Sequence, residues 1–256
     1  MENYFDLTGQ VAVVTGASSG LGVQYAKALA NQGARIALIA RREEKLKAVK
    51  EEIESSYDTT VRYYPLDLTE FDKIQGIVDQ IEKDFGKIDI LVNNAGIARG
   101  YLSKDFPQED WLVMINTNLN SVFFMAQAVG NVMIKNKYGR VINIGSVHSN
   151  VSIPYGRLSA YVTTKFGVRG LTIALAQEWA QYNITVNAIG PAYFKSEMTE
   201  KLLDNENFKG VVDAICPMKR IGNPGELNTT LLYFASKHSS YTTGQLITVD
   251  GGWTTV

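Results

Sequence analysis

Tyr161 and Lys165 are a pair of side chains whose types and spacing suit acid–base chemistry. They are four residues apart in a segment typical of a helix, so they would share one helix face with Cβ atoms about 5–6 Å apart. Tyrosine titrates near pH 10, but an ammonium group about 4 Å away contributes roughly 4 kcal/mol at an effective dielectric of 20, or about three pKa units. We therefore expect Lys165 to lower the pKa of Tyr161 toward the range of a general acid or base. Such pairs also arise by chance on helix surfaces, so this one gains meaning only from its surroundings.

A glycine-rich turn near the N-terminus is suited to binding a phosphate. The β-branched run Val11–Thr15 is followed by Gly16, Gly20 and Gly22 and then by a helix-length segment. Glycines let the backbone approach a pyrophosphate closely, and the N-terminus of the next helix offers unpaired N–H groups and a positive dipole end. An ordinary strand–helix turn can carry the same glycines, but the position after the first strand favours dinucleotide binding.

Two arginines after the second β-branched run bear on which dinucleotide is bound. An acid at this place would bond the ribose 2′-hydroxyl of NAD. The run Arg35–Ala40 instead continues into Arg41 and Arg42, and the first acid is Glu43. Arg41 would pair with a 2′-phosphate and Arg42 would assist, although a solvated basic helix start is the alternative. We expect a preference for NADP(H), with NAD(H) also possible.

Short β-branched runs alternate with longer amphipathic segments along the whole chain. The predicted strands are Val11–Thr15, Arg35–Ala40, Val61–Pro65, Ile88–Val92, Gly139–Ile144, Thr185–Ile189 and Gln245–Val249. The predicted helices lie near residues 20–32, 42–56, 70–85, 108–136, 159–182 and 224–236. Each connection is long enough for a helix, which implies parallel pairing, and right-handed crossovers place helices on both faces of the sheet. We expect one doubly wound α/β domain over residues 1–256, with a seven-stranded parallel sheet.

Local patterns refine this outline. Thr69–Asp72 matches a capping box, and Pro224 after Asn223 matches a helix start. Residues 193–222 hold polar, helix-length stretches without a strand, which favours a lid or substrate loop. The lysines of the second helix alternate with glutamates, as on a solvated helix face, and are Lys45, Lys47 and Lys50.

Composition excludes several classes of function. A formal net charge of −1 gives no sign of a nucleic-acid or anionic-membrane partner. Two histidines and one cysteine, far apart in the sequence, provide no set of metal ligands, so we expect no metal site. We expect Cys216 to be buried and His148 to face solvent or nearby backbone. The N-terminal residues lack a basic region followed by an apolar one, and we expect a soluble cytoplasmic protein.

Several motifs in order make the sequence resemble the short-chain dehydrogenase/reductase family. Besides the glycine turn and the Tyr161–Lys165 pair, Asn93–Gly96 follows the fourth predicted strand, Gly145–Ser146 the fifth, and Val249–Gly252 the seventh. The resemblance covers nearly the whole chain. It implies a Rossmann-type fold and hydride transfer between a nicotinamide and the carbon of a ketone or secondary alcohol.

The resemblance also implies roles for individual residues. It makes Tyr161 the acid/base, Ser146 the hydroxyl that polarises the substrate oxygen, and Lys165 the ligand of the nicotinamide ribose. Asn118 would anchor a water for proton relay, with Asn116 and Asn120 as nearby competitors. Cofactor contacts are implied for Gly16, Ser18, Ser19, Gly20, Leu21, Gly22, Asp67, Leu68, Asn94, Ala95, Gly96, Pro191, Phe194 and Ser196.

The sequence departs from the family pattern after the sixth predicted strand. The usual Pro-Gly pair is Pro191-Ala192 here, which puts the local backbone geometry in doubt. Phe194 and Ser196 fall where the family binds the nicotinamide carboxamide, and the serine keeps a hydroxyl.

Three segments further resemble the gluconate 5-dehydrogenase branch, which interconverts a sugar acid and its keto form. They are residues 94–99, 106–111 and 193–199. A hydroxysteroid, a 3-oxoacyl group on an acyl carrier and a catalytically silent nucleotide-binding scaffold remain alternatives. Members of the family commonly form tetramers through two long helices and the C-terminal strand. A homotetramer is therefore expected, or a dimer, and the segments 108–136 and 159–182 suit those helices.

Overall fold

The central element is a seven-stranded, all-parallel sheet with strand order β3-β2-β1-β4-β5-β6-β7, as the doubly wound prediction requires. The computed structural model describes residues 3–153 and 157–255, so residues 1–2, 154–156 and 256 of the expected domain lie outside the described residues. The strands are β1 (Val11–Thr15), β2 (Arg35–Ala40), β3 (Val61–Pro65), β4 (Ile90–Asn93), β5 (Gly139–Ile144), β6 (Ile184–Pro191) and β7 (Leu246–Val249). The order reverses between β1 and β4, where open α/β sheets bind their ligands.

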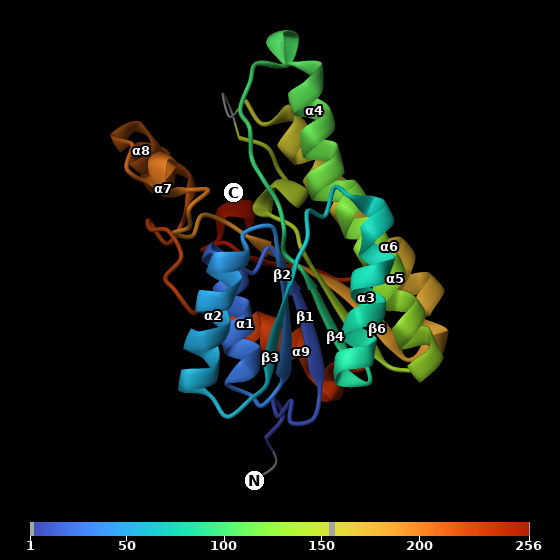
Figure 1. Ribbon diagram of the computed structural model, residues 1–256. Coiled ribbons are helices and arrows are strands. Elements are labelled where there is room, and N and C mark those ends of the chain that lie inside the picture. The colour runs from blue at the N-terminus through green and yellow to red at the C-terminus, as the bar shows by residue number, and fades with distance from the viewer. Residues whose placement is uncertain (1–2, 154–156, 256) are drawn as a thin grey trace.

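Helices cover both faces of the sheet (Figure 1). One apolar cluster joins the sheet to α1 (Gly20–Ala30), α2 (Glu43–Ser56) and α9 (Asn228–Ala235). A second cluster joins the other face to α3 (Phe71–Phe85), α5 (Ser121–Asn136) and α6 (Ser159–Trp179). The remaining helices are α4 (Gln108–Ile115), α7 (Glu200–Leu203) and α8 (Glu206–Ile215), and the last two lie in the segment expected to be a lid.

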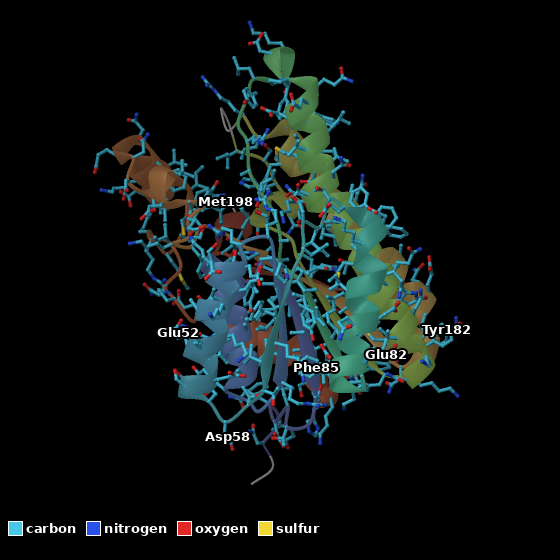
Figure 2. All side chains as sticks on the ribbon, in the orientation of Figure 1. Glu52, Asp58, Glu82, Phe85, Tyr182 and Met198 are labelled. Atoms are coloured by element: carbon cyan, nitrogen blue, oxygen red, sulfur yellow. The ribbon has the colours of Figure 1, made fainter. Side chains whose placement is uncertain are left out.

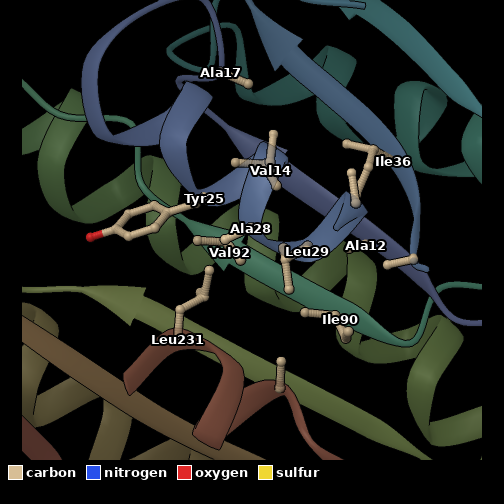
Figure 3. Close-up of a cluster of buried hydrophobic side chains, with 14 of the residues drawn as sticks. Ala12, Val14, Ala17, Tyr25, Ala28, Leu29, Ile36, Ile90, Val92 and Leu231 are labelled. Atoms are coloured by element: carbon tan, nitrogen blue, oxygen red, sulfur yellow. The ribbon is translucent and has the colours of Figure 1, made fainter. Parts of the chain in front are cut away.

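Successive side chains along a strand point to opposite faces of the sheet, so each strand contributes residues to both apolar clusters. In β1, Ala12 and Val14 belong to the cluster around α1, whereas Val11 and Val13 belong to the one around α3. Figure 3 shows Val14 packed among side chains from β4, α1 and α9. Because a strand of this kind is buried on both sides, it is apolar throughout, and each fully buried Val or Ile contributes about 1.5–3 kcal/mol.

One predicted helix cap and one predicted helix start are wrong. Helix α3 has no capping box; instead the Asp67 carboxylate accepts from the Thr69 backbone N–H at 3.0 Å, because a short acidic side chain reaches its own backbone two residues on. Helix α9 begins at Asn228 rather than 224, because Gly225 takes a φ of +94° that a helix cannot contain. The Glu226 carboxylate accepts from the Asn223 N–H at 2.7 Å in that turn.

The predicted 108–136 helix is interrupted. A π-helical turn at Asn116–Asn120 separates α4 from α5. Among the described residues, the combined stretch Gln108–Asn136 is long and apolar enough to span a membrane by length and composition alone. In its most apolar window 44% is buried inside the fold, where α5 packs on α3, β4 and β5, so the apolar character has an explanation in the core.

Gly130 in α5 provides a test of how closely α5 and α6 pack. A Cβ at this position would lie 2.6 Å from the Trp179 ring, so we expect Gly130→Ala to lower the free energy of unfolding by about 1–3 kcal/mol. Gly76 in α3 has no atom within 4 Å of such a Cβ, and Gly76→Ala should raise it by about 1 kcal/mol through helix propensity. Urea unfolding measures both, and equal shifts would contradict the packing.

Candidate functional site

The glycine turn after β1 is packed so closely that side chains are excluded from it. A Cβ on Gly22 would lie 2.3 Å from the Gly16 carbonyl oxygen, and one on Gly16 would lie 2.9 Å from the Ala95 Cα. Gly16 and Gly20 also have positive φ values of 65° and 57°. These positions therefore require glycine, and the turn folds back onto the start of α1. Leu21, in the first turn of α1, packs against the apolar cluster on this face of the sheet.

The ends of β1 and β4 are tied together at the point where the strand order reverses. The Thr15 hydroxyl accepts from the backbone N–H groups of Asn94 and Ala95, at 2.9 and 3.1 Å. In return the Asn94 amide donates to the Thr15 carbonyl at 2.9 Å. This holds the segment Asn94–Gly96 beside the glycine turn.

This cradle fits a dinucleotide phosphate. Ser19 is the N-cap residue of α1, but its side chain makes no capping hydrogen bond. The amides of the first helical turn are therefore available to an anion, with the helix dipole favouring negative charge. A Cβ on Gly20 would meet only Ser196, at 3.3 Å, so this side of the turn lies open up to the 193–222 segment.

Asn118 is buried on the π-helical turn between α4 and α5. Its side-chain oxygen accepts from the Ile97 N–H at 2.8 Å, and its amide donates to the Ile97 carbonyl at 2.9 Å. The same oxygen lies 3.4 Å from the position of a Cβ on Gly96. The side chain thus fixes the loop after β4, and the π turn aims it there; Asn116 and Asn120 bond each other instead.

Lys165 lies in the interior rather than on a helix surface. Only 5% of the residue is exposed. Its Nζ donates a hydrogen bond of 2.8 Å to the carbonyl of Ile144, at the end of β5. Burial lowers the pKa of Lys165 to about 8. The amine lies 5.6 Å from the centre of the Tyr161 ring, so the pair converges as the spacing predicted.

The expected lowering of the Tyr161 pKa is wrong. Burial raises the pKa of Tyr161, and hydrogen bonding from the Ser146 side chain opposes this only in part. The reason is that the environment that disfavours the ammonium ion disfavours the phenolate as well. At neutral pH the phenol is therefore protonated and able to donate.

His148 is buried and does not face solvent, since it follows Ser146 in a short 3-10 turn (Val147–Ser149). Its Nδ1 lies 3.0 Å from the Val151 carbonyl and its Nε2 lies 3.1 Å from the Tyr193 hydroxyl. A carbonyl only accepts, so Nδ1 carries the proton. Burial lowers the pKa of His148, so the ring is neutral, and the Tyr193 hydroxyl donates to Nε2.

The aromatic neighbours of His148 connect it to the reacting groups. Its ring contacts Tyr161 edge-on, with centres 6.0 Å apart. Tyr193 also packs against Phe208 and Trp253, at 4.6 and 5.1 Å. A cavity of about 450 Å³ lies beyond Tyr193, lined by the 192–229 region and Val249–Trp253 rather than by Tyr161 or Ser146. The resemblance includes Tyr193 in the segment 193–199, but its bond to His148 could not be predicted because it spans 45 residues.

The basic residues after β2 divide their contacts. Arg42 donates to the hydroxyls of Ser18 and Ser19 at 3.1 and 2.7 Å, so it lies against the glycine turn. Arg41 is more exposed and lies 3.6 Å from the Asp67 carboxylate. Arg42 rather than Arg41 is therefore the arginine nearest the expected phosphate site. Leu68, the residue after Asp67, is buried.

Lys45 and Glu197 were missed by sequence reasoning, which placed Lys45 on a solvated face. In the structure Lys45 and Arg42 both bind the Glu197 carboxylate. The signal for Lys45 was its position one helical turn after Arg41 and Arg42. No signal existed for Glu197, which reaches them from 152 residues away.

The segment after β6 is anchored despite the missing glycine. Pro191 ends β6, and Phe194 is buried against Gly222 with an isolated bridge between their backbones. The Ser196 hydroxyl is 3.0 Å from that of Thr199, and Thr199 in turn donates to the Phe194 carbonyl. Cys216 is buried, as expected.

Within residues 3–153 and 157–255 there is no cluster of His, Cys, Asp or Glu that could hold a metal ion.

Comparison with known proteins gives full-length matches. A family model described as short chain dehydrogenase matches residues 10–207. The chain is 38% identical over 252 residues to a gluconate 5-dehydrogenase of Gluconobacter oxydans, covering 98% of this chain and 96% of the relative. It is also 38% identical over 246 residues to a 3-oxoacyl-[acyl-carrier-protein] reductase of Thermotoga maritima, covering 96% and 98%.

A solved structure agrees with these matches. A gluconate 5-dehydrogenase from Burkholderia cenocepacia, in complex with NADP and tartrate, superposes with a TM-score of 0.95 at 35% identity, covering 99% of this chain and 98% of that one. The architecture described above is therefore shared over its whole length.

His148 gives the site a pH-dependent effect on stability. Its pKa is lowered in the folded protein, so the unfolded chain binds more protons near and below pH 6.5, and stability is lost as pH falls through that range. His148→Gln cannot take up this proton. Between pH 7 and pH 5 the free energy of unfolding should fall more in the wild type than in the variant. Parallel curves from urea unfolding would contradict the buried, neutral ring.

Proposed function

Because the chain belongs to the short-chain dehydrogenase family, and is an NAD(P)-dependent oxidoreductase acting on CH–OH groups, we propose that it interconverts a sugar acid or polyol with its ketone. The gluconate/5-ketogluconate pair is the expected substrate type. The observation that carries the proposal is the convergence of a phenol, a hydroxyl and an amine, with the amine beside Gly96 in the loop that is tied to the glycine turn. These are Tyr161, Ser146 and Lys165.

Tyr161 is proposed as the acid that protonates the substrate oxygen during reduction. Its raised pKa keeps the proton on the phenol until negative charge develops on that oxygen. The Ser146 hydroxyl, which lowers the pKa of Tyr161 against the larger effect of burial, would donate to the same oxygen and stabilise the charge in the transition state. When bound, a nicotinamide cofactor supplies or accepts the hydride at the substrate carbon.

Lys165 and Asn118 are proposed to assist Tyr161 by binding the cofactor and by relaying protons. The Lys165 amine has two further donor positions besides its bond to Ile144, and these would bind the hydroxyls of the cofactor's ribose. Near neutral pH it is largely protonated, so it would also favour the phenolate during alcohol oxidation. Asn118 holds the loop that carries Gly96 and would anchor a water for proton relay.

The polar character of the site supports a hydroxylated substrate. The Tyr193 hydroxyl donates to His148, so its oxygen can accept from a substrate hydroxyl near the reacting carbon. The Gluconobacter relative acts on gluconate, and the Burkholderia structure contains tartrate, a small hydroxy acid. The Thermotoga relative supports a second candidate, reduction of a 3-oxoacyl group on a carrier protein, because its identity is the same.

A substrate panel followed at 340 nm with NADPH separates these candidates. We expect turnover of 5-ketogluconate and none of a 3-oxoacyl thioester; the reverse result would favour the second candidate. Tight NADPH binding without turnover of any ketone would instead indicate a catalytically silent scaffold.

Tyr161→Phe tests the proposed acid. Its kcat for ketone reduction should fall by roughly 10²–10⁴-fold, while NADPH binding followed by fluorescence changes by less than about twofold. Tyr182→Phe removes a phenol at the far end of α6, well away from the site (Figure 2), and should leave kcat unchanged. Full activity of the Tyr161 variant would refute the mechanism.

NADP(H) is the proposed preferred cofactor, with Arg42 as the main ligand of the 2′-phosphate and Arg41 assisting. The support is the position of Arg42 against Ser18 and Ser19, and the absence of an acid at the end of β2 in the sequence. Asp67, Leu68, Asn94 and Ala95 would then border the adenosine, and Phe194 and Ser196 the nicotinamide end.

Arg42→Ala and Arg41→Ala compare the two neighbours. The first should raise the KM for NADPH about tenfold or more, and that for NADH by less than about twofold, because a charge-assisted bond to phosphate is lost. Arg41→Ala should raise the KM for NADPH by a smaller factor. Equal effects of Arg42→Ala on both cofactors would show that the 2′-phosphate is held elsewhere.

We propose that the chain is a single domain that assembles into a homotetramer, or a dimer, in the cytoplasm. Residues 193–222 are proposed to act as the substrate lid. Large apolar side chains on three neighbouring helices support the assembly, since each is more than a third exposed. They are Leu112, Phe123, Phe166 and Ile173. Exposed apolar groups on one set of helices are typical of an interface.

Light scattering after gel filtration should give four times the mass of the chain. Phe166→Glu places a charge in the proposed interface and should yield smaller species, because a buried unpaired charge is costly. Lys104→Glu, at an exposed position outside the helices named, is the control. A wild-type monomer with full activity would contradict the assembly.

A further inference from the structure

A carboxylate from the 193–222 segment occupies a basic cluster beside the glycine turn. Glu197 accepts from Arg42 Nη2 at 3.0 Å and from Lys45 Nζ at 2.6 Å, with all three side chains about half exposed. The two cations, together with Ser19, hold the pKa of Glu197 at about 2, so it is ionised at any pH at which the protein works. Figure 2 shows the next residue, Met198, near the upper end of α2.

The two cations belong to the cofactor side of the molecule. Arg42 donates to Ser18 and Ser19 of the turn, and it is the N-cap residue of α2, one turn before Lys45. The end of β2 is where an α/β sheet of this type meets the adenosine ribose. The donors gathered there, a guanidinium and an ammonium with two hydroxyls beside them, are those that bind a phosphate.

The Glu197 carboxylate and a 2′-phosphate would compete for the same donors, and their like charges would repel each other at this distance. Arg42 directs Nη2 to both the turn and Glu197, and the Lys45 amine lies within hydrogen-bond distance of Glu197. Arg41, the other cation at this strand end, lies against Asp67 instead. A 2′-phosphate arriving at this cluster therefore competes with the carboxylate for Arg42 and Lys45.

We propose that Glu197 is an internal occupant of the 2′-phosphate site, which NADP(H) displaces and NAD(H) leaves in place. The inference rests on the proposed cofactor site. It makes Glu197 a specificity-determining residue that opposes NADP(H) binding and ties the 193–222 segment to α2 when no 2′-phosphate is bound. Because coupling is reciprocal, a phosphate at the site weakens the hold of Glu197 on α2 by the same factor.

Binding of adenosine 2′,5′-bisphosphate and of 5′-AMP to the cofactor-free protein tests this by calorimetry, without any activity measurement. Removing the competing charge in Glu197→Gln should tighten the bisphosphate roughly three- to tenfold, the range expected for two exposed ion pairs. Binding of 5′-AMP, which lacks the 2′-phosphate, should stay within about twofold. Glu200→Gln makes the same change of charge three residues away, where the structure gives Glu200 no ion pair among the described residues, and should behave as the wild type.

Two results would overturn the inference: equal bisphosphate affinity in Glu197→Gln and Glu200→Gln, or weaker affinity in Glu197→Gln. Fluorescence titration with NADPH and NADH then separates this inference from the proposed cofactor preference. A wild type that binds NADH more tightly, with a shift toward NADPH in Glu197→Gln, contradicts the preference and supports the occupant. A wild type that prefers NADPH, with no shift in the Glu197→Gln variant, supports the cofactor preference and contradicts the role of Glu197 as occupant.

Discussion

The buried amine of Lys165 is the interaction on which the site depends. An ammonium ion with one carbonyl partner, at Ile144, is costly to keep inside a protein, and its pKa of about 8 measures that cost. Its position fixes the end of β5 relative to α6, and through α6 it fixes Tyr161. The same burial keeps the Tyr161 phenol protonated, so the acid and the cation beside it follow from one environment.

Parallel strands supply the remaining geometry. Because β1, β4, β5 and β6 all end on one side of the sheet, the segments after them meet there. Thr15 and Asn94 link the first two ends, and Asn118 holds the loop after β4 from a π turn. None of these bonds is local in sequence, yet each is made by backbone or by a short side chain, which limits how far the site can deform.

Sequence reasoning reached the fold, the strand limits to within a few residues and the meeting of Tyr161 with Lys165. These rest on periodic patterns and on spacing within one helix, which are local. It missed the buried state of His148, its bond to Tyr193 and the Lys45–Glu197 pair, because each depends on where a distant segment is placed. The direction of the pKa of Tyr161 was missed for a related reason: a helix spacing gives the distance between two groups but not their burial.

Titration of Lys165 tests the central claim directly. Carbon-13 labelling of lysine, with Lys165→Met to assign the resonance, gives the midpoint for the ε-carbon of this one residue in the cofactor-free protein. For a buried amine bonded to Ile144 we expect a midpoint lowered to about 8. A midpoint at the ordinary lysine value of 10.5 would show an amine in contact with water, and the arrangement of phenol, hydroxyl and amine derived from its burial would be wrong.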